Sequence, residues 1–201
     1  QPFRPQAFEW GLIPGWVRDR QAALEIRTKT LNARSETIFE KPSFKAAAKG
    51  KRCLIMVDGF YEYHHYKSKT YPYFIQSVKD EPLVLAGLWE EWVDKETGEV
   101  VQTCTVVTTE ANGIMARIHN NPKLEGPRMP VILSRANQEV WLKPCHTEED
   151  MIALLNLCRP CPDSSLRYYT VRRHKGKNGV GDVPEAMEEF VYEELRAERS
   201  F

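Results

Sequence analysis

Two side chains that can exchange protons near neutral pH, Glu62 and His119, lie in distinctive sequence settings. Glu62 follows an apolar run and a turn dipeptide in the segment DGFYEY, so aromatic residues surround it. A carboxyl group buried among aromatic rings retains its proton near neutrality and can act as a general acid. His119 follows a helical pattern and precedes a proline-containing loop, and imidazole is the usual acid–base group at this pH. Each residue also has a simpler interpretation, as an outward-facing strand residue or a solvated loop histidine.

A second group of side chains is suited to binding anions and flat rings. Asn32 and Arg34 flank Ala33, so both point the same way if this segment is extended. A guanidinium group such as that of Arg34 binds phosphate through a planar fork of donors. Trp10 and Trp16 bracket the turn in WGLIPGW, where they could stack on a ligand, anchor a hairpin or belong to the core.

The five cysteines give only a weak signal for metal or redox chemistry. Their odd number, with no secretory leader visible, favours a reducing compartment. Cys158 and Cys161 have C-x-x-C spacing, but a single pair is a weak zinc signal, and this pair does not begin a thioredoxin-type helix. Cys53 and Cys104 lie in apolar runs, where a thiol packs as a small hydrophobic group. We therefore expect no metal and no cofactor.

Taken in their order, four segments resemble the SRAP family, the SOS response-associated peptidases that process abasic sites. The matching segments read WGLIPGW at 10–16, NARSET at 32–37, DGFYEY at 58–63, and IHN followed by PRMP within 118–130. The similarity runs from about Phe8 to about Asn178, most of the chain. Four motifs in the order of the family argue against accidental similarity.

This resemblance implies an enzyme of DNA repair whose partner is single-stranded DNA carrying an abasic site. Members of the family trap the ring-opened sugar as a covalent thiazolidine cross-link, through a cysteine at the mature N-terminus. They also process their own N-terminus by proteolysis, and we expect lyase activity as a further possibility. The chemistry is sound, because an α-amine is partly neutral at physiological pH and can attack an aldehyde.

The resemblance also implies a role for individual residues. Asn32 matches an asparagine that holds the N-terminal cysteine and the sugar, and Arg34 matches an arginine that grips DNA phosphate. Glu62 matches the catalytic glutamate, a proton shuttle for sugar ring opening and for N-terminal self-processing. His119 matches a histidine that hydrogen-bonds the reacting sugar oxygen and assists closure or reversal of the cross-link. Thr108 matches a threonine close to that site.

Further side chains could contact the DNA around the lesion. An abasic site offers no base, so recognition rests on phosphate contacts and on stacking of the flanking bases. Trp10, Trp16 and Tyr63 are the stacking candidates, each worth about 1–3 kcal/mol if stacked, and Tyr63 replaces the usual tryptophan of the family. Lys45 and Arg128 are candidates for phosphate contacts.

The sequence departs from the family pattern at its start and beside His119. The N-terminal M-C-G-R segment is absent, so we expect a short segment to precede Gln1. An inserted loop at Asn120–Gly126 separates His119 from Arg128. Two alternatives stay open. One is a thiol peptidase acting on other proteins, which needs an internal cysteine, and the other is a non-catalytic module that binds single-stranded DNA.

Short strands separated by turn signals must position these residues. Strands are expected over 8–13, 52–58, 60–66, 71–78, 83–92, 99–108, 130–133 and 166–171. Helical patterns cover 109–118 with a Thr109 cap, 135–142, and 147–157 with a Thr147–Asp150 capping box. Because strands and helices do not alternate regularly, this order predicts an α+β fold with a strand-rich, antiparallel, barrel-like sheet and peripheral helices.

The whole chain of 201 residues suits a single domain over 1–201, with an acidic helix over 182–201. Its 28 basic and 28 acidic side chains cancel, which disfavours a polycation that coats nucleic acid or membranes. The charges are nevertheless distributed in blocks along the chain. Residues 1–60 carry 11 basic and 6 acidic side chains, and residues 165–180 carry 5 basic and none acidic. These blocks could converge on an anion or form solvated faces. We expect a cytoplasmic monomer with no membrane association.

Overall fold

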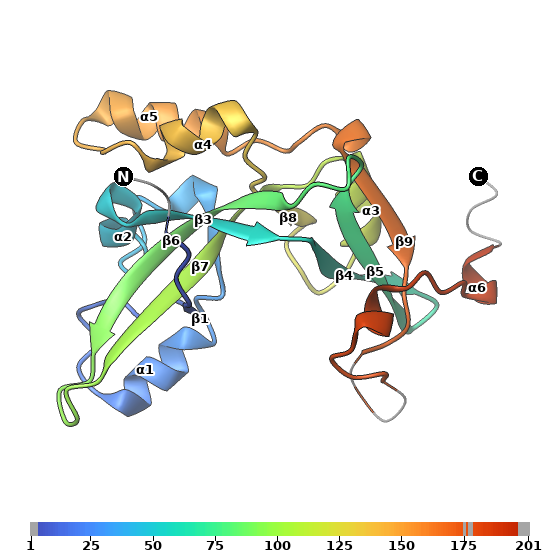
Figure 1. Ribbon diagram of the computed structural model, residues 1–201, viewed down its shortest axis with the longest axis horizontal. Coiled ribbons are helices and arrows are strands. Elements are labelled where there is room, and N and C mark those ends of the chain that lie inside the picture. The colour runs from blue at the N-terminus through green and yellow to red at the C-terminus, as the bar shows by residue number, and fades with distance from the viewer. Residues whose placement is uncertain (1–3, 175, 177–178, 197–201) are drawn as a thin grey trace. The chain divides into compact units, whose positions relative to one another are not determined.

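The computed structural model describes residues 4–174, 176 and 179–196, and it divides the chain into two compact units (Figure 1). The first unit comprises Gln1–Met56, Val84–Thr109 and Pro130–Pro160. The second unit comprises Val57–Leu83, Glu110–Met129 and Cys161–Phe201. No helix within the described residues is long and apolar enough to cross a membrane.

A six-stranded sheet lies mainly in the first unit. Its strands follow the order β1-β7-β6-β3, and β2 and β8 also pair with β7. The strands are β1 (Glu9–Trp10), β2 (Asn32–Arg34), β3 (Arg52–Val57), β6 (Leu83–Val93), β7 (Val100–Glu110) and β8 (Arg128–Pro130). The long β6–β7 hairpin is antiparallel, whereas the two short strands β1 and β2 run parallel to β7.

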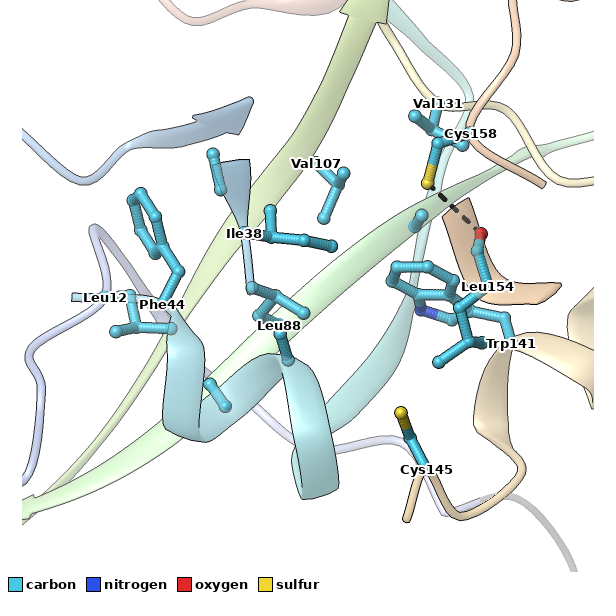
Figure 2. Packing of buried hydrophobic residues seen from close by; sticks show 14 of the residues in the cluster. Leu12, Ile38, Phe44, Leu88, Val107, Val131, Trp141, Cys145, Leu154 and Cys158 are labelled. Atoms are coloured by element: carbon cyan, nitrogen blue, oxygen red, sulfur yellow. Dashed lines mark hydrogen bonds between the residues drawn. The ribbon is translucent and has the colours of Figure 1, made fainter. Parts of the chain in front are cut away.

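One face of this sheet carries the hydrophobic core of the first unit (Figure 2). Along β7, Thr103, Thr105 and Val107 are buried and the residues between them are half-buried, as the two-residue period of a strand requires. Trp141 is fully buried in the core, and its indole nitrogen donates to the carbonyl oxygen of Cys53 at 3.1 Å. The indole thereby satisfies its polar atom while its ring fills the core.

Four helices belong to the described part of the first unit, and the local sequence explains where they begin. They are α1 (Arg20–Arg27), α2 (Lys45–Gly50), α4 (Arg135–Leu142) and α5 (Glu148–Leu157). The Asp19 side chain accepts from the Ala22 backbone at 2.8 Å, which caps α1. The capping box predicted for Thr147 and Asp150 is confirmed, with both reciprocal bonds present at the start of α5.

The second unit contains a three-stranded antiparallel sheet in the order β4-β5-β9. Its elements are β4 (Gly59–Tyr66), β5 (Lys69–Ser77), β9 (Leu166–Thr170), α3 (Gly113–Ile118) and α6 (Glu193–Arg196). Lys67 and Ser68 join β4 to β5, and both have positive φ angles, of 45° and 61°. Two such residues make the type I′ turn whose twist matches a tight hairpin.

Most expected strands and the mixed α+β class are confirmed, but the expected barrel-like sheet is not. The described residues form two separate sheets, and β1 and β2 introduce parallel pairing into one of them. The expected helix cap at Thr109 is also wrong. Thr109 is a buried strand residue whose hydroxyl donates to the Cys158 carbonyl at 2.9 Å, and α3 is capped instead by the side chain of Asn112.

The acidic stretch 182–201 differs from the expected helix within its described part. Pro184–Met187 forms a 3-10 turn, and α6 covers only Glu193–Arg196. Between them Glu189 forms an isolated antiparallel bridge with Val171, and the Phe190 backbone donates to the Thr170 carbonyl at 2.7 Å. The expectation for 197–201 lies outside the described residues.

Candidate functional site

In the first unit, β2 presents Asn32 and Arg34 at the end of β7. Asn32 pairs with Val106, and Arg34 pairs with Thr108. Ala33, between them, is fully buried, whereas both neighbours are exposed. The expectation that Asn32 and Arg34 point the same way is therefore confirmed, because alternate residues of a strand share a face.

Thr108 lies on the same face of the sheet as Arg34, since directly paired residues in adjacent strands point the same way. Its hydroxyl lies 3.5 Å from the Ala33 carbonyl oxygen and donates to it. The structure thus brings three of the expected residues, Asn32, Arg34 and Thr108, onto one end of one sheet face.

The two tryptophans of the first motif are surface residues rather than core residues. Trp10 is 54% exposed and Trp16 is 58% exposed. The Trp10 indole donates to the Leu31 carbonyl at 2.7 Å, directly before Asn32, and the Trp16 indole donates to the Pro42 carbonyl at 3.3 Å. Each indole is thus fixed at its edge while much of its ring stays uncovered, which is compatible with stacking.

Lys45, the other cation expected in this unit, is the first residue of α2 and is exposed. It follows Pro42, the residue whose carbonyl holds the Trp16 indole, by three positions. An ammonium group at such a position remains solvated and can approach a phosphate as a point charge.

In the second unit, Glu62 lies on β4, the outer strand of the three-stranded sheet. Its side chain is half-buried, and Oε1 accepts a hydrogen bond from the backbone N–H of Tyr63 at 2.9 Å. The carboxylate therefore lies at the outer edge of β4, where backbone groups have no neighbouring strand to pair with.

Glu62 and Tyr63 point to opposite faces of this sheet. Glu62 shares its face with His64, whose Nδ1 lies 3.0 Å from the carbonyl oxygen of Arg117 in α3. Tyr63 points to the other face, where its hydroxyl lies 3.0 Å from Nε2 of His174. Burial raises the pKa of the Tyr63 hydroxyl, with a further contribution from the nearby Glu62 charge. The stacking expected of Tyr63 would thus involve the face away from α3.

His119 ends α3, and its ring is held by backbone atoms of Arg128. Nδ1 lies 2.9 Å from both the N–H and the carbonyl oxygen of Arg128. Whichever of these bonds forms, Nδ1 is occupied and the backbone of Arg128 orients the ring. Nε2 is then the ring nitrogen left for proton exchange with a substrate. The inserted loop therefore lies between His119 and the residue whose backbone holds its ring.

Asn120 was missed as a functional candidate and treated only as the first residue of the inserted loop. Its side-chain amide forms two hydrogen bonds to the backbone of His65 on β4, at 2.7 and 3.0 Å. The separation of 55 positions between the partners explains the omission, because no local pattern signals such a contact.

All five cysteines are free thiols, and burial is the main cause of a raised pKa at each of them. The pKa of Cys53 and of Cys158 is raised to about 12, and that of Cys161 to about 11. No group of three or more potential metal ligands occurs within the described residues. A thiol that stays protonated is a poor nucleophile.

The fold and these motif residues define a class of protein, and comparison with known proteins identifies the family that corresponds to this class. A family model described as SOS response associated peptidase (SRAP) matches residues 2–178. The chain belongs to the SRAP family, as the four motifs predicted.

Individual relatives support this membership. Abasic site processing protein YoqW of Bacillus subtilis (strain 168) is 39% identical over 163 residues, covering 81% of this chain and 66% of that protein. Abasic site processing protein YoaM of the same organism is 36% identical over 178 residues, covering 88% and 73% respectively. A crystal structure of a protein from Bacteroides thetaiotaomicron superposes with a TM-score of 0.81 and 35% identity, over 92% of this chain and 77% of that chain. The chain thus spans just under two thirds of the length of YoqW.

Proposed function

We propose that this protein senses abasic sites in single-stranded DNA and joins itself covalently to them through an N-terminal cysteine. The observation that carries the proposal is the SRAP-family match over residues 2–178, which includes the motif residues Asn32 and Arg34 on β2, Glu62 on β4 and His119 after α3. The names of YoqW and YoaM as abasic site processing proteins support the choice of substrate. Self-processing of the N-terminus and lyase activity belong to the same proposal.

The proposed reaction uses the aldehyde that an abasic sugar exposes when its ring opens. The α-amine of the cysteine adds to the aldehyde carbon, and loss of one water gives an imine. The thiolate then adds to the imine carbon while the nitrogen takes up a proton, which closes a five-membered thiazolidine ring. The α-amine is suited to the first step because it titrates near pH 8 and is partly neutral at pH 7.

The residues described above would divide the remaining work. Glu62 moves a proton to and from the sugar oxygen during ring opening, since its carboxylate lies at an open strand edge. His119 offers Nε2 to the reacting oxygen, with Nδ1 held by Arg128. Asn32 positions the cysteine and the sugar, and Arg34 binds a flanking phosphate from the same face of β2.

A thiol peptidase that acts on other proteins is a weaker candidate. Such an enzyme needs an internal cysteine that ionises readily near His119. Each of the five cysteines in this sequence instead has a pKa raised by burial. A DNA-binding module without catalysis remains the second alternative, and the experiment below separates it from the proposal.

The test uses the full-length protein and a single-stranded oligonucleotide with one abasic site. The proposal predicts a band of reduced mobility that survives heating in denaturant and is absent with the matching intact strand. An oligonucleotide whose abasic aldehyde has been reduced to an alcohol is the chemical control and should give no such band. Binding to the abasic strand without any heat-stable band would support the non-catalytic module instead.

A further inference from the structure

Asn120 joins the loop after His119 to the outer edge of β4 with both ends of its amide. Oδ1 accepts from the N–H of His65 at 2.7 Å, and Nδ2 donates to the carbonyl oxygen of the same residue at 3.0 Å. An amide that bonds both backbone groups of one residue mimics the pairing of a neighbouring strand. The contact therefore fixes both the position and the direction of the chain at Asn120.

The same strand edge carries the carboxylate of Glu62. Glu62 accepts from the N–H of Tyr63, and Asn120 accepts from the N–H of His65. Both N–H groups point outward from the same edge because their residues are two apart, and a strand rises about 7 Å over two residues. His119 is the direct neighbour of Asn120, so these two hydrogen bonds hold the backbone next to His119 against the strand that carries Glu62.

Two further contacts, in addition to the Asn120 amide, hold the turn that carries His119. On the helix side, the last turn of α3 is held by Nδ1 of His64 at the Arg117 carbonyl. At the other end of the inserted loop, Arg128 holds the His119 ring by its backbone. Directly after His119, the Asn120 amide ties the chain to the strand that carries Glu62.

We propose that Asn120 is a positioning residue that holds His119 in register with Glu62 for the reaction with abasic DNA. This inference rests on the proposed function. Asn120 need not touch the substrate, because its effect passes through the placement of His119. Misplacing a reacting group by about 1 Å can lower a rate roughly 100-fold, so two hydrogen bonds that fix a turn are sufficient to matter.

The test compares single-turnover rates of cross-linking to an oligonucleotide with one abasic site. Asn120→Ala removes both bonds and should slow the reaction about 10- to 100-fold while leaving DNA affinity unchanged. Asn120→Asp keeps the side-chain size and the acceptor for the His65 N–H, but places a carboxylate oxygen against the His65 carbonyl. This variant should also react slowly, and it replaces Asn120→Ala in the test if the alanine variant folds poorly.

A double-mutant cycle distinguishes positioning from a general loss of structure. If Asn120 acts through His119, then Asn120→Ala should have little further effect in a His119→Ala background. Asn121→Ala is the matched control, because the Asn121 side chain accepts from the Lys123 N–H at 3.0 Å, a hydrogen bond within the loop itself. This variant should react at the rate of the unaltered protein.

Several results would overturn the inference. One is a normal rate in both Asn120 variants, and another is an Asn120→Ala defect that is equally large in the His119→Ala background. A third is a defect of equal size in Asn121→Ala, which would mean that any loosening of the loop suffices. If the unaltered protein forms no cross-link, then the proposed function itself fails, and the inference fails with it.

Discussion

Buried thiols are the residues whose chemistry most clearly separates the competing functions. Desolvation is the main cause of the raised pKa of Cys53, and the neighbouring Cys104 adds to it. The shift from 9.0 to about 12 lowers the thiolate population of Cys53 near pH 7 about 1000-fold. Because the thiolate is the reacting form, a cysteine in this environment is a poor candidate for the peptidase nucleophile.

Alkylation by iodoacetamide should therefore be slow at Cys53 in the folded protein. A raised pKa means that the thiol stays protonated at neutral pH and gains reactivity only as the pH rises toward about 12. Peptide mass mapping at pH 7.5 should show modification about 1000-fold slower than in the same protein unfolded in guanidinium. Equal rates in the folded and unfolded protein would contradict the assignment.

Which side chains the sequence could identify depends on how local their structural signal is. Asn32 and Arg34 were correctly placed on one face, because strand alternation depends only on neighbouring residues. The exposure of Trp10 was not decided by sequence, since an indole suits both core and surface. Asn120 had no local signal at all, because its partner His65 lies on a strand far away in sequence.

At the scale of elements, hairpins and helix caps have a local sequence signal, whereas short parallel strands do not. Strands were expected over 83–92 and 99–108 with a turn between them, and the Asp94 N–H donates to the Glu99 carbonyl at 2.9 Å, as in a hairpin. β1 and β2 have only two and three residues, and their partner β7 lies about 70 or more positions away. Runs so short carry too little pattern to reveal a parallel pairing.

The position of β2 at one end of β7 gives a testable prediction for DNA binding. Arg34→Ala should weaken binding to single-stranded DNA and reduce the slope of log affinity against log salt by about 0.7, the effect of one lost phosphate contact. Fluorescence anisotropy titrations at several salt concentrations measure this slope.

The matched control for this prediction is Lys95→Ala. Lys95 lies in the β6–β7 loop, beyond the Val93–Val100 pair, whereas Arg34 pairs with Thr108. Thr108 lies eight positions after Val100 on β7, or about 26 Å along the strand. The control should keep the slope of the unaltered protein, and an unchanged slope in Arg34→Ala would remove Arg34 from the DNA contacts.

For the molecule as a whole, the sequence patterns predicted the broad class but not the architecture. The mixed α+β class followed from the order of strand and helix patterns, and the structure confirms it. The division of the strands into two sheets did not follow, because hydrophobic alternation is the same in one sheet or two. The cytoplasmic location and the monomeric state stay predictions.

The balanced charge of the whole chain is compatible with an enzyme that grips a few phosphates locally. The basic excess of residues 1–60 includes Arg34 and Lys45 on exposed positions of the first unit. The basic segment 165–180 lies partly outside the described residues, although Arg167 within it pairs with Asp80 at 2.6 Å. Covalent capture needs little general attraction to DNA, because the chemistry supplies the persistence of the complex.

The measurement that tests the central claim most directly is the mass of the adduct between the full-length protein and abasic single-stranded DNA. Formation of a thiazolidine predicts a species whose mass is the sum of the protein and the oligonucleotide less one water, with the DNA located on an N-terminal cysteine. Attachment to a different residue, or the absence of any covalent species, would contradict the account.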